Sequence, residues 1–150
     1  MASTDAAPTG ALPLVLDAAA HRISFALRAD VAAVGEARHW VRQQLQEWGI
    51  APDSVDTAVL VVSELFTNAV VHTSSEIITC AVGATPDQLL IEVVDDGTGQ
   101  SRPSPQRACP QDEDGRGLML VKAVSQRWGA SPTGVGGGQV VWAVLRLVRA

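Results

Sequence analysis

One segment, residues 55–70, constrains the fold more than any other part of the chain. Apolar side chains recur there with the 3.6-residue period of an α-helix and form one continuous stripe. The stripe consists of Val55, Ala58, Val59, Val62, Leu65, Phe66, Ala69 and Val70. Pro52-Asp53-Ser54 is typical of a helix start, and the pattern ends near His72. The spacing therefore predicts a long helix whose apolar face packs into a core.

Local patterns on both sides of this helix predict the remaining elements. Residues 21–28 alternate between apolar and polar side chains, which predicts a half-buried strand. Asp30 is a suitable N-cap for a helix that ends at Gly49. The later elements are a strand pair over 76–82 and 88–95, a short helix over 118–127, and two strands over 128–131 and 140–147. Helices and strands do not alternate strictly, so we predict an α+β fold: a two-layer α/β sandwich of a mixed, mostly antiparallel sheet with helices on one face.

Length and composition favour one folded domain preceded by a tail. The chain has 150 residues, of which 47% are hydrophobic, enough for one sizeable core. Residues 1–20 are rich in Ala, Pro and Thr, and we expect a flexible tail with one short apolar patch at 12–16 that could form a docking turn. Residues 21–150 are expected to form a single domain.

Charge and hydropathy exclude several classes of protein. The net charge of −5 disfavours a nucleic-acid partner. No uninterrupted apolar run approaches the ~18–20 residues of a membrane-spanning helix. The first basic residue is Arg22, so the charged start of a signal peptide is missing. We therefore expect a cytoplasmic protein without a membrane contact.

Glu64 and Asn68 are unexpected on the apolar helix. Glu64 is the only charge between residues 59 and 71, and no cation lies three or four positions from it. A carboxylate and a carboxamide one turn apart on such a helix cost desolvation free energy unless they gain partners. One interpretation is an exposed Glu beside an incidental Asn. The other is a functional site, in which the Asn oxygen binds a hard cation and the Glu acts as a base.

Asp95 ends a strand whose apolar side chains share its side. Alternation predicts that Asp95 points inward and that Asp96 points to the other face. Gly97 and Gly99 then permit positive φ angles and close approach of the backbone to a ligand. An inward carboxylate at this place could accept a hydrogen bond from an exocyclic amine. An ordinary Asp-Gly turn after a strand is the alternative.

A third motif, Gly115-Arg116-Gly117-Leu118, opens the short helix. Two glycines lower helix propensity, but they expose backbone N–H groups that can bind a phosphate at a helix N-terminus. About 18 residues without periodicity, 97–114, precede it, and loops of this length are usually functional or disordered. The motif lacks the pattern of a dinucleotide-binding fingerprint or a P-loop.

The order of the three motifs resembles the GHKL ATPase superfamily, which has the Bergerat ATP-binding fold. The resemblance covers about residues 20–148. Within this superfamily, the short length and the run from Gly115 to Val121, followed by Arg127-Trp128-Gly129, are similar to the bacterial anti-sigma factor serine/threonine kinases, and small actinobacterial ATP-binding regulators look most similar.

This resemblance implies a role for each motif. Glu64 would be the general base, Asn68 would coordinate Mg²⁺, and Asp95 would bind the adenine amino group. Gly97 and Gly99 would pass under the nucleotide, and residues 100–114 would form an ATP lid. The backbone N–H groups of the last motif would bind the phosphates; its residues are Gly115, Arg116, Gly117 and Leu118.

The resemblance also implies partners and leaves two functions open. The first is a protein serine/threonine kinase that binds a sigma factor, or that phosphorylates a serine of a STAS-type anti-sigma factor antagonist. A homodimer is implied by the same resemblance. The second is a non-catalytic, ATP-dependent binding module for the same partners. Retention of Glu64 and Asn68 favours the kinase. Many relatives have Thr where this chain has Gln139-Val140, and this departure favours the module.

Overall fold

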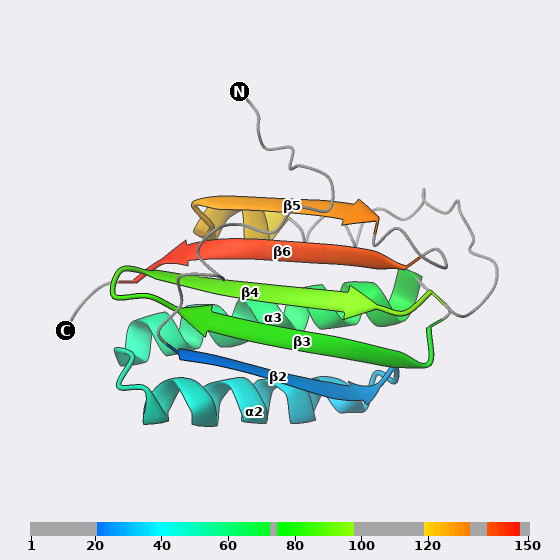
Figure 1. Ribbon diagram of the computed structural model, residues 1–150, viewed down its shortest axis with the longest axis horizontal. Coiled ribbons are helices and arrows are strands. Elements are labelled where there is room, and N and C mark those ends of the chain that lie inside the picture. Colours follow the sequence, from blue (N-terminus) through cyan, green and yellow to red (C-terminus); the bar gives the residue numbers. More distant parts are fainter. Residues whose placement is uncertain (1–20, 73–74, 98–118, 133–137, 148–150) are drawn as a thin grey trace.

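Five antiparallel strands form one sheet, and all the described helices cover the same face of it (Figure 1). The computed structural model describes residues 21–72, 75–97, 119–132 and 138–147. Its elements are β2 (His21–Arg28), α2 (Ala33–Glu47), α3 (Pro52–His72), β3 (Ile77–Ala84), β4 (Gln88–Asp95), β5 (Arg127–Pro132) and β6 (Gln139–Arg146). A short helical segment over 119–124 precedes β5. The α+β prediction is confirmed.

The strand order is β2-β3-β4-β6-β5, which places β4 at the centre of the sheet. All four pairings among the described strands are antiparallel, so no parallel pair of the expected mixed sheet occurs in this part of the chain. β4 and β6 are neighbours although an undescribed segment and β5 separate them in sequence. The carboxyl end of β4 therefore lies beside the start of β6.

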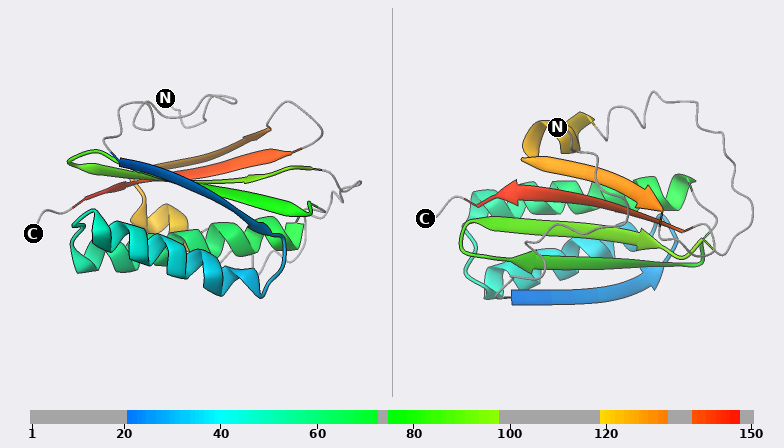
Figure 2. Two further views of the ribbon diagram at one scale, coloured as in Figure 1. Left: turned by 60° about the horizontal axis from the view of Figure 1, so that its bottom comes forward. Right: turned by 45° about the horizontal axis from the view of Figure 1, so that its top comes forward.

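The core lies between the sheet and the two long helices, as Figure 2 shows from the side. The apolar stripe of α3 is buried as predicted, and Val62, Leu65 and Phe66 are fully buried. α2 adds a shorter stripe that includes Val41 and Leu45. An ion pair between Arg42 and Asp56, 3.2 Å apart, joins the two helices at the surface. This packing fixes which face of α3 is turned away from the core.

Some local predictions differ from the structure at element ends. α2 begins at Ala33 with Ala32 as its N-cap, so Asp30 is not the cap that was expected. Asp30 instead closes the turn before the helix: its Oδ1 accepts a hydrogen bond from the N–H of Ala32 at 3.0 Å. A two-residue turn thus separates the acidic side chain from the helix.

α3 corrects the expectation that no segment is long and apolar enough to cross a membrane. Its 21 residues contain a window with a mean hydropathy of 1.4, which passes that test by length and composition. However, 56% of this window is buried inside the folded chain. Core helices pass the same test, and the packing of α3 against α2 and the sheet is that of a core helix.

The opposite face of the sheet carries a second, smaller apolar cluster. We call it the outer cluster; it consists of Leu90, Val140, Trp142 and Val144. These side chains come from the two central strands, β4 and β6. They point away from α2 and α3 because they alternate with residues of the main core.

Candidate functional site

A buried carboxylate, Asp95, ends the central strand β4 and faces the helices. Asp95 is 4% exposed and Asp96 is exposed, so the inward-facing carboxylate is Asp95, as predicted. Burial raises the pKa of Asp95 above its ordinary value, and the neighbouring Asp96 carboxylate adds to this shift. Hydrogen bonds from Ser75 and from the backbone of Gly97 and Gln139 oppose it. Asp95 is therefore a partly desolvated carboxylate whose position is fixed by hydrogen bonds.

Two hydrogen bonds to one oxygen orient the Asp95 carboxylate. The hydroxyl of Ser75 donates to Oδ1 at 3.1 Å, and the N–H of Gly97 donates to the same oxygen at 3.0 Å. The N–H of Gly97 also lies 2.9 Å from the Ser75 hydroxyl oxygen, which accepts from it. The three groups form a closed network that fixes the direction of the carboxylate.

Sequence reasoning missed Ser75. It lies just before β3, and the polar run 72–75 was interpreted only as the end of the α3 pattern. Its burial, at 9% exposure, and its bond to Asp95 depend on the pairing of β3 with β4, which places Ile78 opposite Asp95. A run of polar residues between an apolar helix and a strand is the one signal in the sequence that could have indicated it.

Gly97 adopts the backbone conformation that its position predicts. Its φ angle is +63°, in the left-handed region that disfavours residues with a Cβ. This conformation turns the chain directly after Asp95 and aims the Gly97 N–H back at the carboxylate. The glycine is thus part of the network and not only a flexible link.

Glu64 and Asn68 lie on the carboxyl-terminal half of α3 and are both partly exposed. They share their helix face with Leu60 and Val71, which are 36% and 58% exposed. Val61, which the sequence reading placed on that face, is fully buried. Within the described part of the chain, no cation pairs with Glu64. An unpaired carboxylate on this face is available to a ligand.

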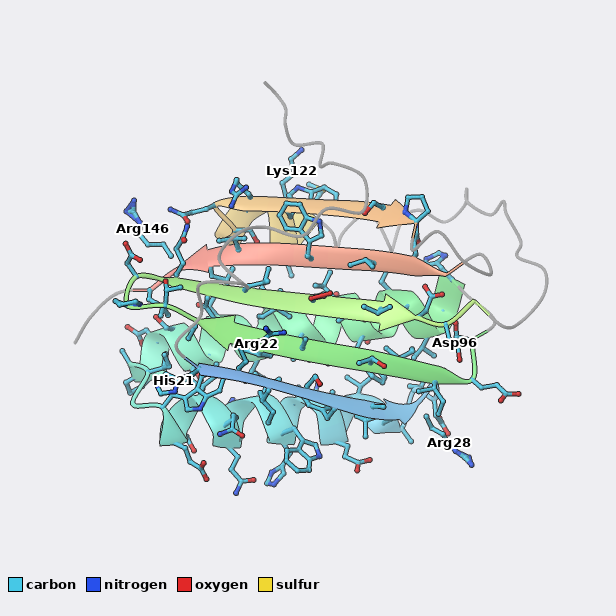
Figure 3. All side chains as sticks on the ribbon, viewed as in Figure 1. His21, Arg22, Arg28, Asp96, Lys122 and Arg146 are labelled. Carbon is cyan, nitrogen blue, oxygen red and sulfur yellow. The ribbon has the colours of Figure 1, made fainter. Side chains whose placement is uncertain are left out.

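The fold brings these side chains to one end of the molecule. α3 ends at His72, Ser75 follows it, and Ser75 binds Asp95, so the last turns of α3 and the end of β4 adjoin (Figure 1). Asp96, labelled in Figure 3, marks this end of the sheet. A shallow hollow lined by Asp53, Thr57 and Leu145 lies at the other end of α3. It therefore does not belong to the site.

Gln139 and Val140, the first two residues of β6, lie on opposite faces of the sheet. Gln139 is the direct cross-strand partner of Asp95, whereas Val140 pairs with Val94. Val140 belongs to the outer cluster and is 9% exposed. The side chain of residue 140 is thus directed away from the Asp95 face, and Gln139 is the β6 residue next to the carboxylate.

Several predicted site residues lie outside the described residues. They are Gly99, Gly115, Arg116, Gly117 and Leu118, together with the expected lid, 100–114. Their predicted contacts with a nucleotide stay predictions. The described site consists of Asp95, Ser75, Gly97, Glu64 and Asn68.

Residues 27–145 match the family described as the histidine kinase-like ATPase domain. This match spans most of the chain and includes every described residue of the site. The chain belongs to this family. A histidine kinase-like ATPase domain binds ATP. No curated protein matches the chain.

The fold of this histidine kinase-like ATPase domain also occurs in solved structures. One is the crystal structure of the RsbU and RsbW domains of Rv1364c from Mycobacterium tuberculosis, which is similar with a TM-score of 0.62 and 20% sequence identity. The similarity covers 87% of this chain and 33% of that chain, so this chain corresponds to about a third of that structure's length. At this identity, the similarity shows a shared fold.

The described residues could bind a Mg²⁺ ion only if phosphate groups supplied further ligands to it. In the described part of the chain, no three His, Cys, Asp or Glu side chains converge to form a metal site. Asn68 supplies one amide oxygen, which is a suitable ligand for a hard cation. Mg²⁺ commonly binds through one or two protein groups plus substrate phosphates and water. Asn68 therefore fits a Mg²⁺ that arrives with ATP.

Proposed function

We propose that the chain is an ATP-dependent protein serine/threonine kinase of the anti-sigma factor branch. Its substrate would be a serine of a STAS-type anti-sigma factor antagonist, and a sigma factor would be its second partner. The order of the sequence motifs and the fold shared with a structure containing an RsbW domain support this proposal. A cytoplasmic location and a homodimer belong to the same proposal.

The observation that carries the proposal is the placement of Glu64. It is a partly exposed carboxylate, one turn from Asn68, on the half of α3 that adjoins Asp95. A module that only binds ATP has no use for an unpaired carboxylate beside the metal ligand, because a negative charge there repels the phosphates. A kinase has a use for it as a general base.

Each described residue would perform one part of the reaction. Asp95, oriented by Ser75 and Gly97, would accept a hydrogen bond from the adenine amino group. Asn68 would hold Mg²⁺, which neutralises charge on the ATP phosphates when it is bound. The N–H groups of 115–118 would bind phosphate oxygens.

The transfer step follows from these positions. Glu64 would accept the proton of the substrate serine hydroxyl as its oxygen attacks the γ-phosphorus of ATP. The bond from the γ-phosphorus to the β–γ bridging oxygen breaks, and ADP leaves with that electron pair. The products are phosphoserine and ADP, and the proton on Glu64 returns to solvent. Positioning and charge neutralisation lower the barrier of such a reaction.

The non-catalytic binding module loses its main argument. The sequence favoured it because Val140 stands where many relatives have Thr. Val140, however, points to the outer face of the sheet, and Gln139 is the β6 partner of Asp95. The placement of residue 140 on the face away from Asp95 thus supports the kinase over the module.

The test is a capture experiment followed by a transfer assay. The full chain is used as bait in its native lysate with Mg²⁺ and ATP, and with EDTA. Retained proteins are identified, purified and incubated with labelled ATP and the chain, and phosphosites are mapped. We expect ATP-dependent retention of a STAS-type protein and transfer of label to one serine. Retention without transfer to any captured protein would replace the kinase by the binding module.

A further inference from the structure

The outer cluster is buried although no described helix covers it. Of the described side chains, Arg127 of β5 lies over the Trp142 ring, with its guanidinium carbon 5.9 Å from the ring centre. Leu90 and Val144 are 0% exposed, and Trp142 is 3% exposed. Their side chains project from the sheet face opposite α2 and α3, and the helical segment 119–124 also lies on the helix side (Figure 2). Side chains within one face of a sheet do not by themselves exclude water from a central leucine. A cover in addition to these side chains is therefore expected on this face.

The chemistry of the cluster specifies what kind of cover fits. The Nε1 atom of Trp142 is buried and has no hydrogen-bond partner. A buried indole N–H normally finds an acceptor, but no carbonyl or carboxylate oxygen of the described residues lies within hydrogen-bond reach of this atom. Glu92, the cross-strand partner of Trp142, is 7% exposed; burial raises its pKa, and the positive charge of Arg22 opposes this rise. The four cluster side chains are apolar, so an apolar segment fits over them, beside the charged groups of Arg22, Glu92 and Arg127.

The composition of the undescribed segments leaves one candidate. Residues 98–118 contain no Leu, Ile, Val, Phe, Met or Trp before Leu118, and 133–137 contain only Val135 of this group. Residues 73–74 are too short, and 148–150 contain one valine. The segment 12–16, by contrast, has the sequence Leu-Pro-Leu-Val-Leu. In an extended backbone Leu12, Leu14 and Leu16 would share one side.

The distances along the sheet allow this segment to reach the cluster. Arg22 of β2, Leu90 of β4 and Val144 of β6 lie in one row across the sheet, through Gly83 of β3. Strands are about 4.8 Å apart, so β4 lies about 10 Å and β6 about 14 Å from β2. The four residues between Leu16 and His21 extend over as much as about 17 Å. A chain leaving β2 at this row can therefore lay residues 12–16 over the outer cluster. Arg22, labelled in Figure 3, lies on this face beside the path.

From these observations, we propose that the amino-terminal segment, through Leu12, Leu14 and Leu16, docks on the outer cluster and covers Trp142. The segment would then be a third layer of the domain, on the face opposite the nucleotide site, and not a free tail. This inference does not depend on the proposed kinase function, and its test needs no nucleotide.

The test follows the indole N–H of Trp142 by nuclear magnetic resonance in the full chain. The resonance is assigned among the four tryptophans with a Trp142→Phe variant. In a Leu14→Asp/Leu16→Asp variant, we expect this resonance to shift and to lose its protection from solvent exchange. The control, Thr4→Asp/Thr9→Asp, adds the same charges to the same segment outside the apolar patch and should leave the resonance in place.

Two further results decide the inference if the variant misfolds. In the unmodified chain, methyl groups of the leucines in 12–16 should show nuclear Overhauser contacts to the Trp142 ring. Absence of these contacts, or an unchanged Trp142 resonance in the folded variant, would overturn the proposal. Loss of Trp142 protection on dilution would also overturn it, because the cover would then be a second copy of the chain.

Discussion

Asp95 and Gln139 face each other across β4 and β6 as a direct cross-strand pair. The backbone of Gln139 binds the Asp95 carboxylate and helps to hold its pKa down against burial. The pair joins two strands that are adjacent in the sheet and far apart in the sequence. It also places Val140, the next residue, on the other face, and this separation underlies the first prediction.

Val140→Thr should lower the stability of the domain and leave ATP affinity unchanged. Val140 is buried in the outer cluster, and the hydroxyl of threonine would be buried there without a partner, at a cost of about 1–3 kcal/mol. Urea unfolding and ATP titration measure both effects. Gln139→Thr is the matched control, since Gln139 is exposed and should change stability little. Stronger ATP binding by Val140→Thr would contradict the face assignment.

Asp95→Asn should weaken ATP binding about ten- to a hundredfold, because a hydrogen bond to a charged group contributes about 1.5–3 kcal/mol. Asp96→Asn provides the control, since Asp96 is the neighbouring carboxylate and is exposed. Titration calorimetry compares the two variants with the unmodified chain. Equal loss of affinity in both would show that the local charge, and not the inward carboxylate, binds the nucleotide.

ATP affinity should fall as the pH is lowered, and this fall should begin at a higher pH than the ordinary pKa of an Asp would predict. Burial raises the pKa of Asp95, so this carboxyl gains its proton sooner as the pH falls and then no longer accepts as strongly. The sign for stability is opposite: a raised folded-state pKa favours the folded protein below that pKa, and this contribution is lost as the pH rises through it. ATP titrations across the acidic range test the first effect. The pH dependence should be absent in Asp95→Asn.

Glu64→Ala should abolish phosphoryl transfer and leave ATP binding largely intact. A general base acts on the attacking hydroxyl, and its loss typically lowers the rate about 10²–10⁴-fold. Single-turnover transfer from labelled ATP to a captured STAS-type protein is run beside an ATP titration. Glu36→Ala removes an exposed glutamate of α2 and should transfer normally. Normal transfer by Glu64→Ala would remove the base role from this residue.

ATP binding should depend on Mg²⁺ through Asn68. Removal of Mg²⁺ with EDTA should weaken ATP binding by the unmodified chain, because the ion that Asn68 would hold neutralises charge on the phosphates. Asn68→Ala should bind ATP weakly with or without Mg²⁺. Calorimetric titration of both proteins in both conditions gives the comparison. Equal affinity of the unmodified chain in Mg²⁺ and in EDTA would exclude the metal role of Asn68.

The sequence alone determined the features that depend on neighbouring residues. The stripe of α3, the inward direction of Asp95, the outward direction of Asp96 and the turn at Gly97 all follow from helical period, strand alternation and backbone sterics. These rules act over a few residues, so they can be applied without knowledge of the fold. The same rules placed the N-cap of α2 at Asp30, two residues before the observed N-cap, Ala32. The side chain of Asp30 closes a turn before the helix, and a capping pattern does not distinguish these two roles.

Tertiary structure decided which residues meet. The bond from Ser75 to Asp95 and the pairing of Asp95 with Gln139 both depend on strand register. Register is set by burial of one face of the whole sheet, and a shift of one residue would exchange Gln139 and Val140 between faces. No local pattern contains that information, because β4 and β6 are separated in sequence and meet only when the core forms. The sequence thus identified the carboxylate, and the folded sheet selected its partners.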